Sequence, residues 1–380
     1  MFEFHLNSGA RERLEGLTTR SAAIDFHRQL PGYRPTSLHS CDRLAERLGL
    51  AHLLVKEESS RFGLPAYKIL GASWAIYNLL LEVTGLSTLD ELRTGLADSD
   101  LTLLSATDGN HGRAVARAAG WFGLAAEIFV PADIGPVRIE ALLAEGARVR
   151  RIAGSYDEAV RQAAASSGKD RLLIQDTSWP GYEQVPSWIV EGYGTILAEA
   201  EEQLAGAEPI DLVLVQIGVG SLAAATTAHF HTWERRPRLV GVEPLGADCL
   251  LRSVRAGRAV TVPGPHRSVM AGLNCGTPSA AALPLLLSGM DAFLSVPDEY
   301  AFEAMRLLAA EGIVAGESGA AGVAGLLALT EDQAVAEAVG IDRVTRALVI
   351  VTEAATDPVS YEQAVGRPPG VVRRGQYSRG

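Results

Sequence analysis

The chain contains very little lysine. Among its 34 lysines and arginines, only Lys56, Lys68 and Lys169 are lysines. Arginine keeps its charge and cannot supply a nucleophilic amine, so chemistry that needs a primary amine has three candidates. Lys56 ends an apolar run before two glutamates and Lys169 lies in a polar turn, whereas Lys68 follows a Gly/Pro turn and begins an apolar helix. Lys68 is therefore the candidate nucleophile, and apolar surroundings are expected to lower its pKa towards neutrality.

Cysteine is also scarce, and the apolar runs are short. Cys41, Cys249 and Cys275 share no metal-ligand spacing, which predicts buried, apolar-like side chains and no metal site. No apolar run approaches about 18 residues, and no N-terminal signal with a basic region is present, so we expect a cytoplasmic protein without a membrane partner. The formal net charge of −11 argues against nucleic acid as a partner.

What the sequence does contain is an alternation of predicted strands and helices. With 380 residues, of which 47% are hydrophobic, the chain is long enough for two domains with large cores. Strand patterns alternate with helix patterns from residue 101 onward, and this order predicts parallel sheets covered on both faces. The expected strands span 53–56, 101–106, 126–130, 148–152, 172–175, 211–216, 239–242 and 346–351. The expected helices include 68–83, 112–122, 137–145, 156–165 and a long connecting helix at 183–204.

These strands predict an α/β protein with two doubly wound, mainly parallel sheets that meet across a cleft. We expect a large domain formed by residues 1–83 and 200–380 and a smaller α/β domain formed by residues 84–199. The carboxyl ends of the strands would place their loops in the cleft, so the polar loops after the strands are the candidate site.

A glycine-rich loop at 216–223 links a predicted strand to a predicted helix. Its central residues are Gly218, Val219, Gly220, Ser221 and Leu222. Inward-facing backbone N–H groups and the start of a helix favour a bound phosphate. A dinucleotide fingerprint would need a glycine where Ala223 stands, although Glu243 at the end of the next strand keeps a nicotinamide cofactor open. A tight turn with no ligand is the third interpretation.

Two further polar loops follow predicted strands. The loop 105–112 contains Asp108 and Asn110, whose amide can donate a hydrogen bond to an oxygen on a ring, and also His111. Asp176 follows the strand 172–175 and either caps the next turn or faces the cleft as a second carboxylate. Taken alone, each loop is typical of a turn with a capping residue, and His111 is typical of a structural histidine.

In combination and order, these segments resemble the fold type II pyridoxal-phosphate enzymes, the tryptophan synthase β-like group. Within that group the sequence looks most like the diaminopropionate ammonia-lyase family. The resemblance spans about residues 33–361. Its most similar stretches are 61–71, 106–112, 175–183, 270–273 and 352–358.

The resemblance implies pyridoxal 5'-phosphate as the cofactor. Lys68 would form the covalent link to its aldehyde, Gly218 to Leu222 would hold its phosphate, and Asn110 would donate to its 3-oxygen. Thr352 is the candidate partner of the ring nitrogen. A neutral hydroxyl there would leave the pyridine unprotonated, which favours elimination over transamination.

The implied activity is α,β-elimination of ammonia from 2,3-diaminopropionate, a small amino acid, to give pyruvate and ammonia. Lys68 would remove the Cα proton, and Asp108 could act as a base on the opposite face for the D isomer. Carboxylates at Asp108 and Asp176 favour a substrate with a cationic β-ammonium group. A homodimer is expected from the resemblance alone.

Some positions depart from the family pattern and leave other functions open. Ala354 and Ala355 stand where a Gly-Asp pair is usual, Leu222 and Ala223 where an aromatic residue and a glycine are usual, and Val351 where serine is common. One alternative is a pyridoxal-phosphate enzyme for β-elimination or β-replacement on another β-substituted amino acid, as in serine or threonine dehydratases or a biosynthetic synthase. The others are a nucleotide-binding oxidoreductase and a non-catalytic binding protein.

Overall fold

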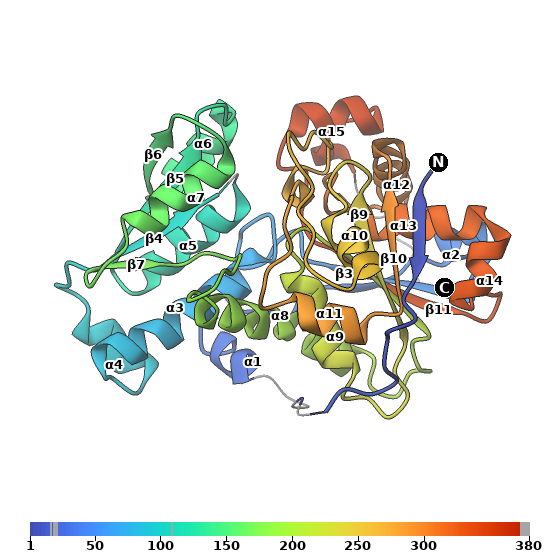
Figure 1. The fold of residues 1–380 in the computed structure, drawn as a ribbon, viewed down its shortest axis with the longest axis horizontal. Helices are drawn as coiled ribbons and strands as arrows, with labels where there is room; N and C mark the ends of the chain where they lie inside the picture. Colours follow the sequence, from blue (N-terminus) through green and yellow to red (C-terminus); the bar gives the residue numbers. More distant parts are fainter. Residues whose placement is uncertain (16, 18–21, 108, 373–380) are drawn as a thin grey trace. The chain divides into compact units, whose positions relative to one another are not determined.

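The structure is a computed structural model that describes residues 1–15, 17, 22–107 and 109–372. The chain forms two compact units (Figure 1). Unit 1 contains residues 1–21, 34–66 and 196–380, and unit 2 contains residues 22–33 and 67–195. This division differs from the expected boundaries after residues 83 and 199. The helix that begins at Lys68 lies in unit 2, not in the unit with the glycine-rich loop.

Unit 1 is built on a seven-stranded sheet. The two outer strands are antiparallel to their neighbours, and the strands between them run parallel. In spatial order the strands are β1 (Glu3–Leu6), β10 (Ala292–Val296), β9 (Arg238–Pro244), β8 (Leu212–Gln216), β11 (Arg346–Val351), β3 (His52–Glu57) and β2 (Leu38–Ser40).

Side chains alternate between the two faces of this sheet. On one face, Val55, Leu214 and Val349 belong to a large apolar core with residues of α2 (Asp42–Leu48), α12 (Asp298–Ala310) and α13 (Ala321–Glu331). Lys56 is adjacent to Val55 in the strand, so its side chain points to the opposite face. The remaining helices of unit 1 are α9 (Ser221–Phe230), α10 (Cys249–Ala256), η1 (Ala271–Leu273), α11 (Leu283–Gly289), α14 (Gln333–Val339), α15 (Pro358–Val365) and η2 (Pro369–Val371).

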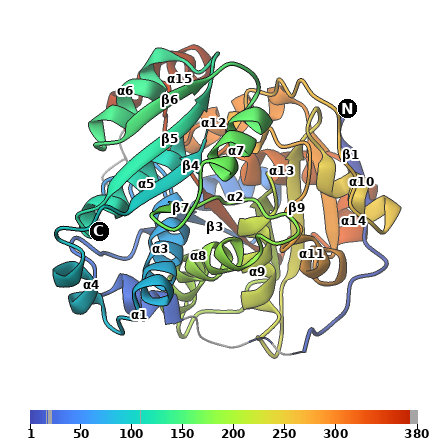
Figure 2. The same ribbon diagram turned by 60° about the vertical axis from the view of Figure 1, so that its left-hand side comes forward.

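Unit 2 contains a four-stranded parallel sheet. Its spatial order is β6 (Arg148–Ile152), β5 (Ala125–Pro131), β4 (Thr102–Ala106) and β7 (Arg171–Leu173). Leu104, Phe129 and Ile152 form a core with α7 (Tyr156–Ala165). The other helices are α1 (Ala22–His27), α3 (Lys68–Thr84), α4 (Leu89–Gly95), α5 (Asn110–Trp121), α6 (Pro136–Ala144) and α8 (Gln184–Gln203), which continues into unit 1. Helices α3 and α5 pack side by side (Figure 2).

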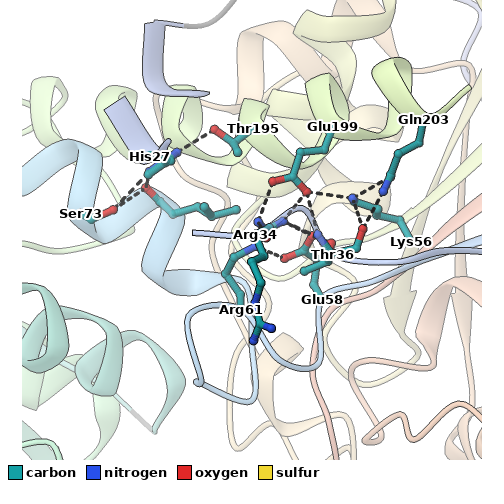
Figure 3. A network of polar contacts seen from close by, with 11 residues as sticks. His27, Arg34, Thr36, Lys56, Glu58, Arg61, Ser73, Thr195, Glu199 and Gln203 are labelled. Carbon is teal, nitrogen blue, oxygen red and sulfur yellow. Dashed lines mark hydrogen bonds and ion pairs between the residues drawn. The ribbon is translucent and has the colours of Figure 1, made fainter. Parts of the chain in front are cut away.

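Two glycines allow α3 and α8 to approach closely. A Cβ atom at Gly192 would lie 2.5 Å from the Leu70 carbonyl oxygen, and one at Gly71 would lie 2.5 Å from Cε1 of Tyr193. The buried side chain of His27 links α1 to both α3 and α8. Its ring nitrogens contact the Thr195 hydroxyl at 2.7 Å and the Leu70 carbonyl at 3.0 Å (Figure 3).

The expected α/β architecture with two mainly parallel sheets is confirmed. The strands expected at 148–152 and 346–351 and the helix expected at 156–165 have those bounds. Strands β1, β2 and β10 and helices α10 and α11 were missed, because short apolar runs do not distinguish a strand from a helix. Among the described residues no single helix is long and apolar enough to span a membrane, and only the bent pair α3 and α4 passes on length and composition.

Candidate active site

Lys68 is the first residue of α3, and its amine forms an ion pair within unit 2. Its Nζ atom donates a hydrogen bond to Oδ2 of Asp176 at 2.7 Å. Asp176 lies three residues beyond β7, where the preceding Gln175 accepts a hydrogen bond from the Ala106 backbone at the end of β4. The side chains of Lys68 and Asp176 are 21% and 11% exposed. The structure thus brings together two of the predicted site residues in a largely buried ion pair.

The surroundings of Lys68 do not lower its pKa, so that expectation was wrong. Burial alone would lower the pKa of the amine, but the carboxylate of Asp176, with Tyr193 and Tyr67, raises it well above its ordinary value. Burial likewise would raise the pKa of Asp176, but Lys68 and then His111 hold it well below its usual range. Without a covalent partner for the amine, both groups are therefore charged at neutral pH.

His111 is the third member of this cluster. It lies in the first turn of α5, is 4% exposed, and its Nε2 atom is 2.9 Å from the Ile174 carbonyl oxygen. Since a carbonyl only accepts, Nε2 carries the proton and Nδ1 keeps its lone pair. Nδ1 is 3.8 Å from Oδ2 of Asp176. Burial lowers the pKa of His111 although Asp176 raises it, so the ring is neutral at neutral pH.

Gly109 and Asn110 form the start of α5. Gly109 precedes the helix with φ of 155°, and Asn110 is its first residue. The Gly109 amide donates to the Thr107 hydroxyl at 2.9 Å. Asp108 lies outside the described residues, so its predicted role stays a prediction.

In unit 1 the glycine-rich loop joins β8 to α9, as predicted. Gly220 has φ of +104°, a left-handed conformation that favours glycine. A Cβ at Gly218 would lie 3.2 Å from the Gly272 carbonyl oxygen. Val219 anchors the loop by accepting a hydrogen bond from the Ser279 amide at 2.8 Å, and Ser221 and Leu222 begin α9. The loop therefore offers backbone N–H groups at a helix start, where an anion is stabilised.

Thr352 follows β11 in the same unit and is 3% exposed. Its hydroxyl oxygen accepts a hydrogen bond of 2.9 Å from Nε2 of Gln216, the last residue of β8. The distance from this hydroxyl to the Ser318 carbonyl oxygen is 3.5 Å, too long for a strong hydrogen bond. The hydroxyl proton of Thr352 is therefore only weakly engaged within unit 1.

The segment before Lys68 contacts the residues that follow Thr352. Ala66 and Glu353 form an isolated β-bridge, and the Ala354 amide donates to the Pro65 carbonyl at 2.8 Å. These contacts fix the last residues of unit 1 before the chain enters unit 2 at Tyr67.

A buried ion network lies around Arg61, at the start of the segment that leads to Lys68 (Figure 3). Arg61 lies between two carboxylates: its Nη1 donates to Glu199 at 2.6 Å, and its Nε donates to Glu58 at 2.8 Å. Lys56 donates to Glu199 at 2.8 Å. Each of these four side chains is at most 1% exposed. Burial lowers the pKa of Lys56 although both glutamates raise it, so the network stabilises the guanidinium of Arg61 more than the amine of Lys56.

Glu243 was the acidic residue for which the sequence left a nicotinamide-binding site possible. The two oxygens of its carboxyl group accept hydrogen bonds from the backbone amides of Leu250 and Leu251, at 2.8 and 2.7 Å, and the residue is 0% exposed. It therefore caps α10 and is not available to a ribose hydroxyl. Of the three cysteines, Cys41 and Cys249 are buried as expected, whereas Cys275 is partly exposed.

Sequence reasoning did not select Tyr67 and Tyr193, which lie beside the Lys68 amine. Their ring centroids are 5.5 and 5.9 Å from Nζ. The available signal was Gly71 and Gly192 inside two predicted helices, because a glycine in a helix interior often marks a close helix approach. The same signal would have placed Tyr193 against the first turn of α3.

Comparisons with known proteins agree with this arrangement. A family model described as "Pyridoxal-phosphate dependent enzyme" matches residues 29–353. The chain is 38% identical over 369 residues to a diaminopropionate ammonia-lyase from Salmonella typhimurium, with 90% of each chain covered. It is 37% identical over 362 residues to the Escherichia coli K12 protein of that name, again with 90% of each covered.

A solved structure gives the same result. The crystal structure of diaminopropionate ammonia-lyase from Escherichia coli in complex with D-serine superimposes with a TM-score of 0.89 at 34% identity. The superposition covers 96% of this chain and 97% of that chain. This protein therefore belongs to the family of pyridoxal-phosphate-dependent enzymes, in which its similar relatives are diaminopropionate ammonia-lyases.

Proposed function

We propose that this protein is a pyridoxal-phosphate-dependent ammonia-lyase that converts 2,3-diaminopropionate and water to pyruvate and two molecules of ammonia. The observation that carries the proposal is the ion pair of Lys68 with Asp176 in a chain 38% identical to a diaminopropionate ammonia-lyase over 90% of its length. A carboxylate beside the reactive amine suits a substrate whose leaving group is a cation.

The residues fit pyridoxal phosphate in both units. Lys68 provides a primary amine for the aldehyde, and the turn around Gly218 and Gly220 provides a phosphate cradle at the start of α9. Asn110 is our candidate donor to the 3-oxygen, and Thr352 is our candidate partner of the ring nitrogen. The weakly engaged proton of the Thr352 hydroxyl supports donation to an unprotonated nitrogen. When bound, the cofactor supplies an electron sink for the charge left at Cα.

The other steps belong to side chains of the chain itself. We assign the removal of the Cα proton to the Lys68 amine, once it is released from its covalent partner. Lys68 takes this proton as the neutral amine that its covalent link releases, and the ammonium that it becomes is then held by Asp176, whose carboxylate accepts the 2.7 Å hydrogen bond from Nζ. Asp108 remains our candidate base for the D isomer.

The main alternative is elimination from, or replacement on, another β-substituted amino acid. The Escherichia coli structure in complex with D-serine supports including hydroxyl substrates and D isomers in the test. Pyruvate and ammonia, or the corresponding oxo acid, should be measured from both isomers of diaminopropionate, serine and threonine and from O-acetylserine. We expect the largest kcat/KM for diaminopropionate, and a larger value for serine or O-acetylserine would reject the assignment.

Three further assignments are proposals that come from the family resemblance. We expect the larger unit to bind most of the cofactor and the smaller unit to carry the Asp-Gly-Asn loop. We also expect a homodimer and a cytoplasmic location. Light scattering after size-exclusion chromatography tests the dimer, and fractionation of the source cells tests the location.

A further inference from the structure

Three side chains of unit 2 lie around the Lys68 amine, and Nδ1 of His111 lies 3.8 Å from one of them, Asp176. Asp176 contributes a carboxylate oxygen at 2.7 Å, and the rings of Tyr67 and Tyr193 lie with their centroids 5.5 and 5.9 Å away. The two rings are 4.7 Å apart and meet edge to face. A carboxylate with two aromatic rings within about 6 Å is a typical binding site for a cation.

Two polar atoms of this cage lack a partner. Among the described residues, neither the hydroxyl of Tyr193 nor Nδ1 of His111 has a hydrogen-bond partner, although both atoms are buried. Tyr193 is 0% exposed and His111 is 4% exposed. A buried polar group without a partner costs stability, so such groups in a site indicate a missing ligand.

The missing ligand must provide hydrogen-bond donors. Nδ1 of His111 is an acceptor because Nε2 carries the ring proton, the Asp176 carboxylate only accepts, and the Tyr193 hydroxyl can accept as well as donate. A primary ammonium has three N–H donors, whereas an alcohol has one. The Lys68 ammonium donates to Asp176 at 2.7 Å but makes no hydrogen bond of normal geometry to the other two atoms.

We propose that Asp176, His111, Tyr67 and Tyr193 form an ammonium cage that Lys68 occupies only while its amine is free, and that binds the β-ammonium group of the substrate when Lys68 is covalently engaged. This inference rests on the proposed function and makes the cage the determinant that selects diamino acids over hydroxy amino acids. The cage is not fully closed, because the side chains of Lys68 and Asp176 remain 21% and 11% exposed.

The first test needs neither cofactor nor turnover. The full-length Lys68→Ala protein is titrated with ethylammonium by calorimetry, and ethanol serves as the uncharged probe of similar shape. We expect saturable ethylammonium binding, at least tenfold tighter than to the cofactor-free protein with Lys68 in place, because there the lysine fills the cage. Ethanol should bind to neither protein.

Further substitutions in the Lys68→Ala background identify the cage residues. Asp176→Asn should weaken ethylammonium binding more than tenfold, and Tyr193→Leu should weaken it about fivefold through loss of the ring face. Tyr193→Phe keeps the aromatic ring and should weaken ethylammonium binding less than Tyr193→Leu does. Tyr77→Leu, in the same helix α3 but outside the cage, is the matched control and should not change binding. If Tyr193→Leu does not fold, Tyr67→Leu at a partly exposed position replaces it.

The second test uses the holoenzyme. Tyr193→Leu should lower kcat/KM for diaminopropionate about fivefold more than it lowers kcat/KM for serine. Equal losses of kcat/KM on both substrates would overturn the cage proposal. So would a Lys68→Ala protein that does not bind ethylammonium, or whose ethylammonium affinity does not change when Asp176 or Tyr193 is replaced. A failed proposed function looks different, because no pyruvate would form from any amino acid while ethylammonium still bound to Lys68→Ala.

Discussion

Replacing Glu199 by glutamine is expected to destabilise unit 1 strongly. Glu199 is 1% exposed and accepts hydrogen bonds from Arg61, from Lys56 and from the Thr36 backbone amide. Glutamine keeps the shape of the side chain but removes its charge. The two buried cations would then face a single carboxylate, that of Glu58, and one positive charge would be left uncompensated.

The pKa of Glu199 gives the size of this effect. Burial alone would raise it, but the hydrogen bonds and charge of Arg61, followed by Lys56, lower it from its ordinary 4.5 to about 2. A decrease of this size corresponds to ~3 kcal/mol of stabilisation of the charged form. Removal of one partner from a buried ion pair typically costs about 3–5 kcal/mol, which agrees. We therefore expect a loss of ~3–5 kcal/mol for Glu199→Gln at neutral pH.

Urea unfolding followed by circular dichroism measures this loss, and hydrogen exchange of peptides from β3 and β11 assigns it to unit 1. Glu303→Gln is the matched control. Glu303 pairs with Arg47 at 3.0 Å in the same unit, but the two side chains are 37% and 58% exposed. Exposed ion pairs contribute about 0–1 kcal/mol, so the control should remain near wild type.

The dependence on pH provides a second check. A carboxylate with a lowered folded-state pKa stabilises the protein above its unfolded pKa, and this stabilisation is lost as the pH falls towards the folded value. The difference between wild type and Glu199→Gln should therefore be full above about pH 5 and shrink as the pH falls from 4.5 towards 2. A loss no larger than that of the control, or one that is constant with pH, would refute the reasoning.

Three further predictions concern the cofactor and the helix caps. Lys68→Ala should abolish the visible absorbance of bound pyridoxal phosphate, and a chromophore that borohydride still fixes covalently would show that another residue carries it. Gly220→Ala should weaken retention of pyridoxal phosphate about tenfold in equilibrium dialysis, since φ is +104° and the new Cβ would meet Leu286 at 2.8 Å; unchanged retention would exclude this loop as the phosphate site. Burial raises the pKa of Glu243 to about 8, so the folded protein holds an extra proton between about pH 5 and 8 and loses stability as the pH rises through that window. In Glu243→Gln the urea midpoint should therefore fall less steeply with pH between about pH 5 and 8. An unchanged pH dependence would show that other groups cause it.

The main architecture could be predicted from local pattern. Alternating apolar strands and amphipathic helices are local signals, so β6, β11 and α7 were found with their bounds. Scarcity of lysine and a Gly/Pro turn were enough to select Lys68 as the candidate amine. The short strand β10 was missed because a five-residue apolar run carries little periodicity.

The electrostatic state of the site could not be predicted in this way. The direction of the pKa shift at Lys68 depends on Asp176, which is 108 positions away in the chain. The contribution of Tyr193 depends on the close approach of α3 and α8. The buried partners of Arg61 likewise come from two segments, one of them 138 positions away. Such contacts are set by tertiary packing, which a single sequence does not reveal.

The order of the segments along the chain also has a consequence for biosynthesis. Residues 67–195 of unit 2 emerge from the ribosome as one continuous segment. In unit 1, by contrast, β3 pairs with β11, and His52 of β3 lies opposite Arg346 of β11, which is translated much later. Strand β3 and the charges of Lys56 and Arg61 must therefore wait for segments translated much later. Pairing over such a distance is slow and exposes an unpaired strand to aggregation. Strands β1, β2 and β3, which are made first, are consequently the part of the nascent protein for which a chaperone is most useful.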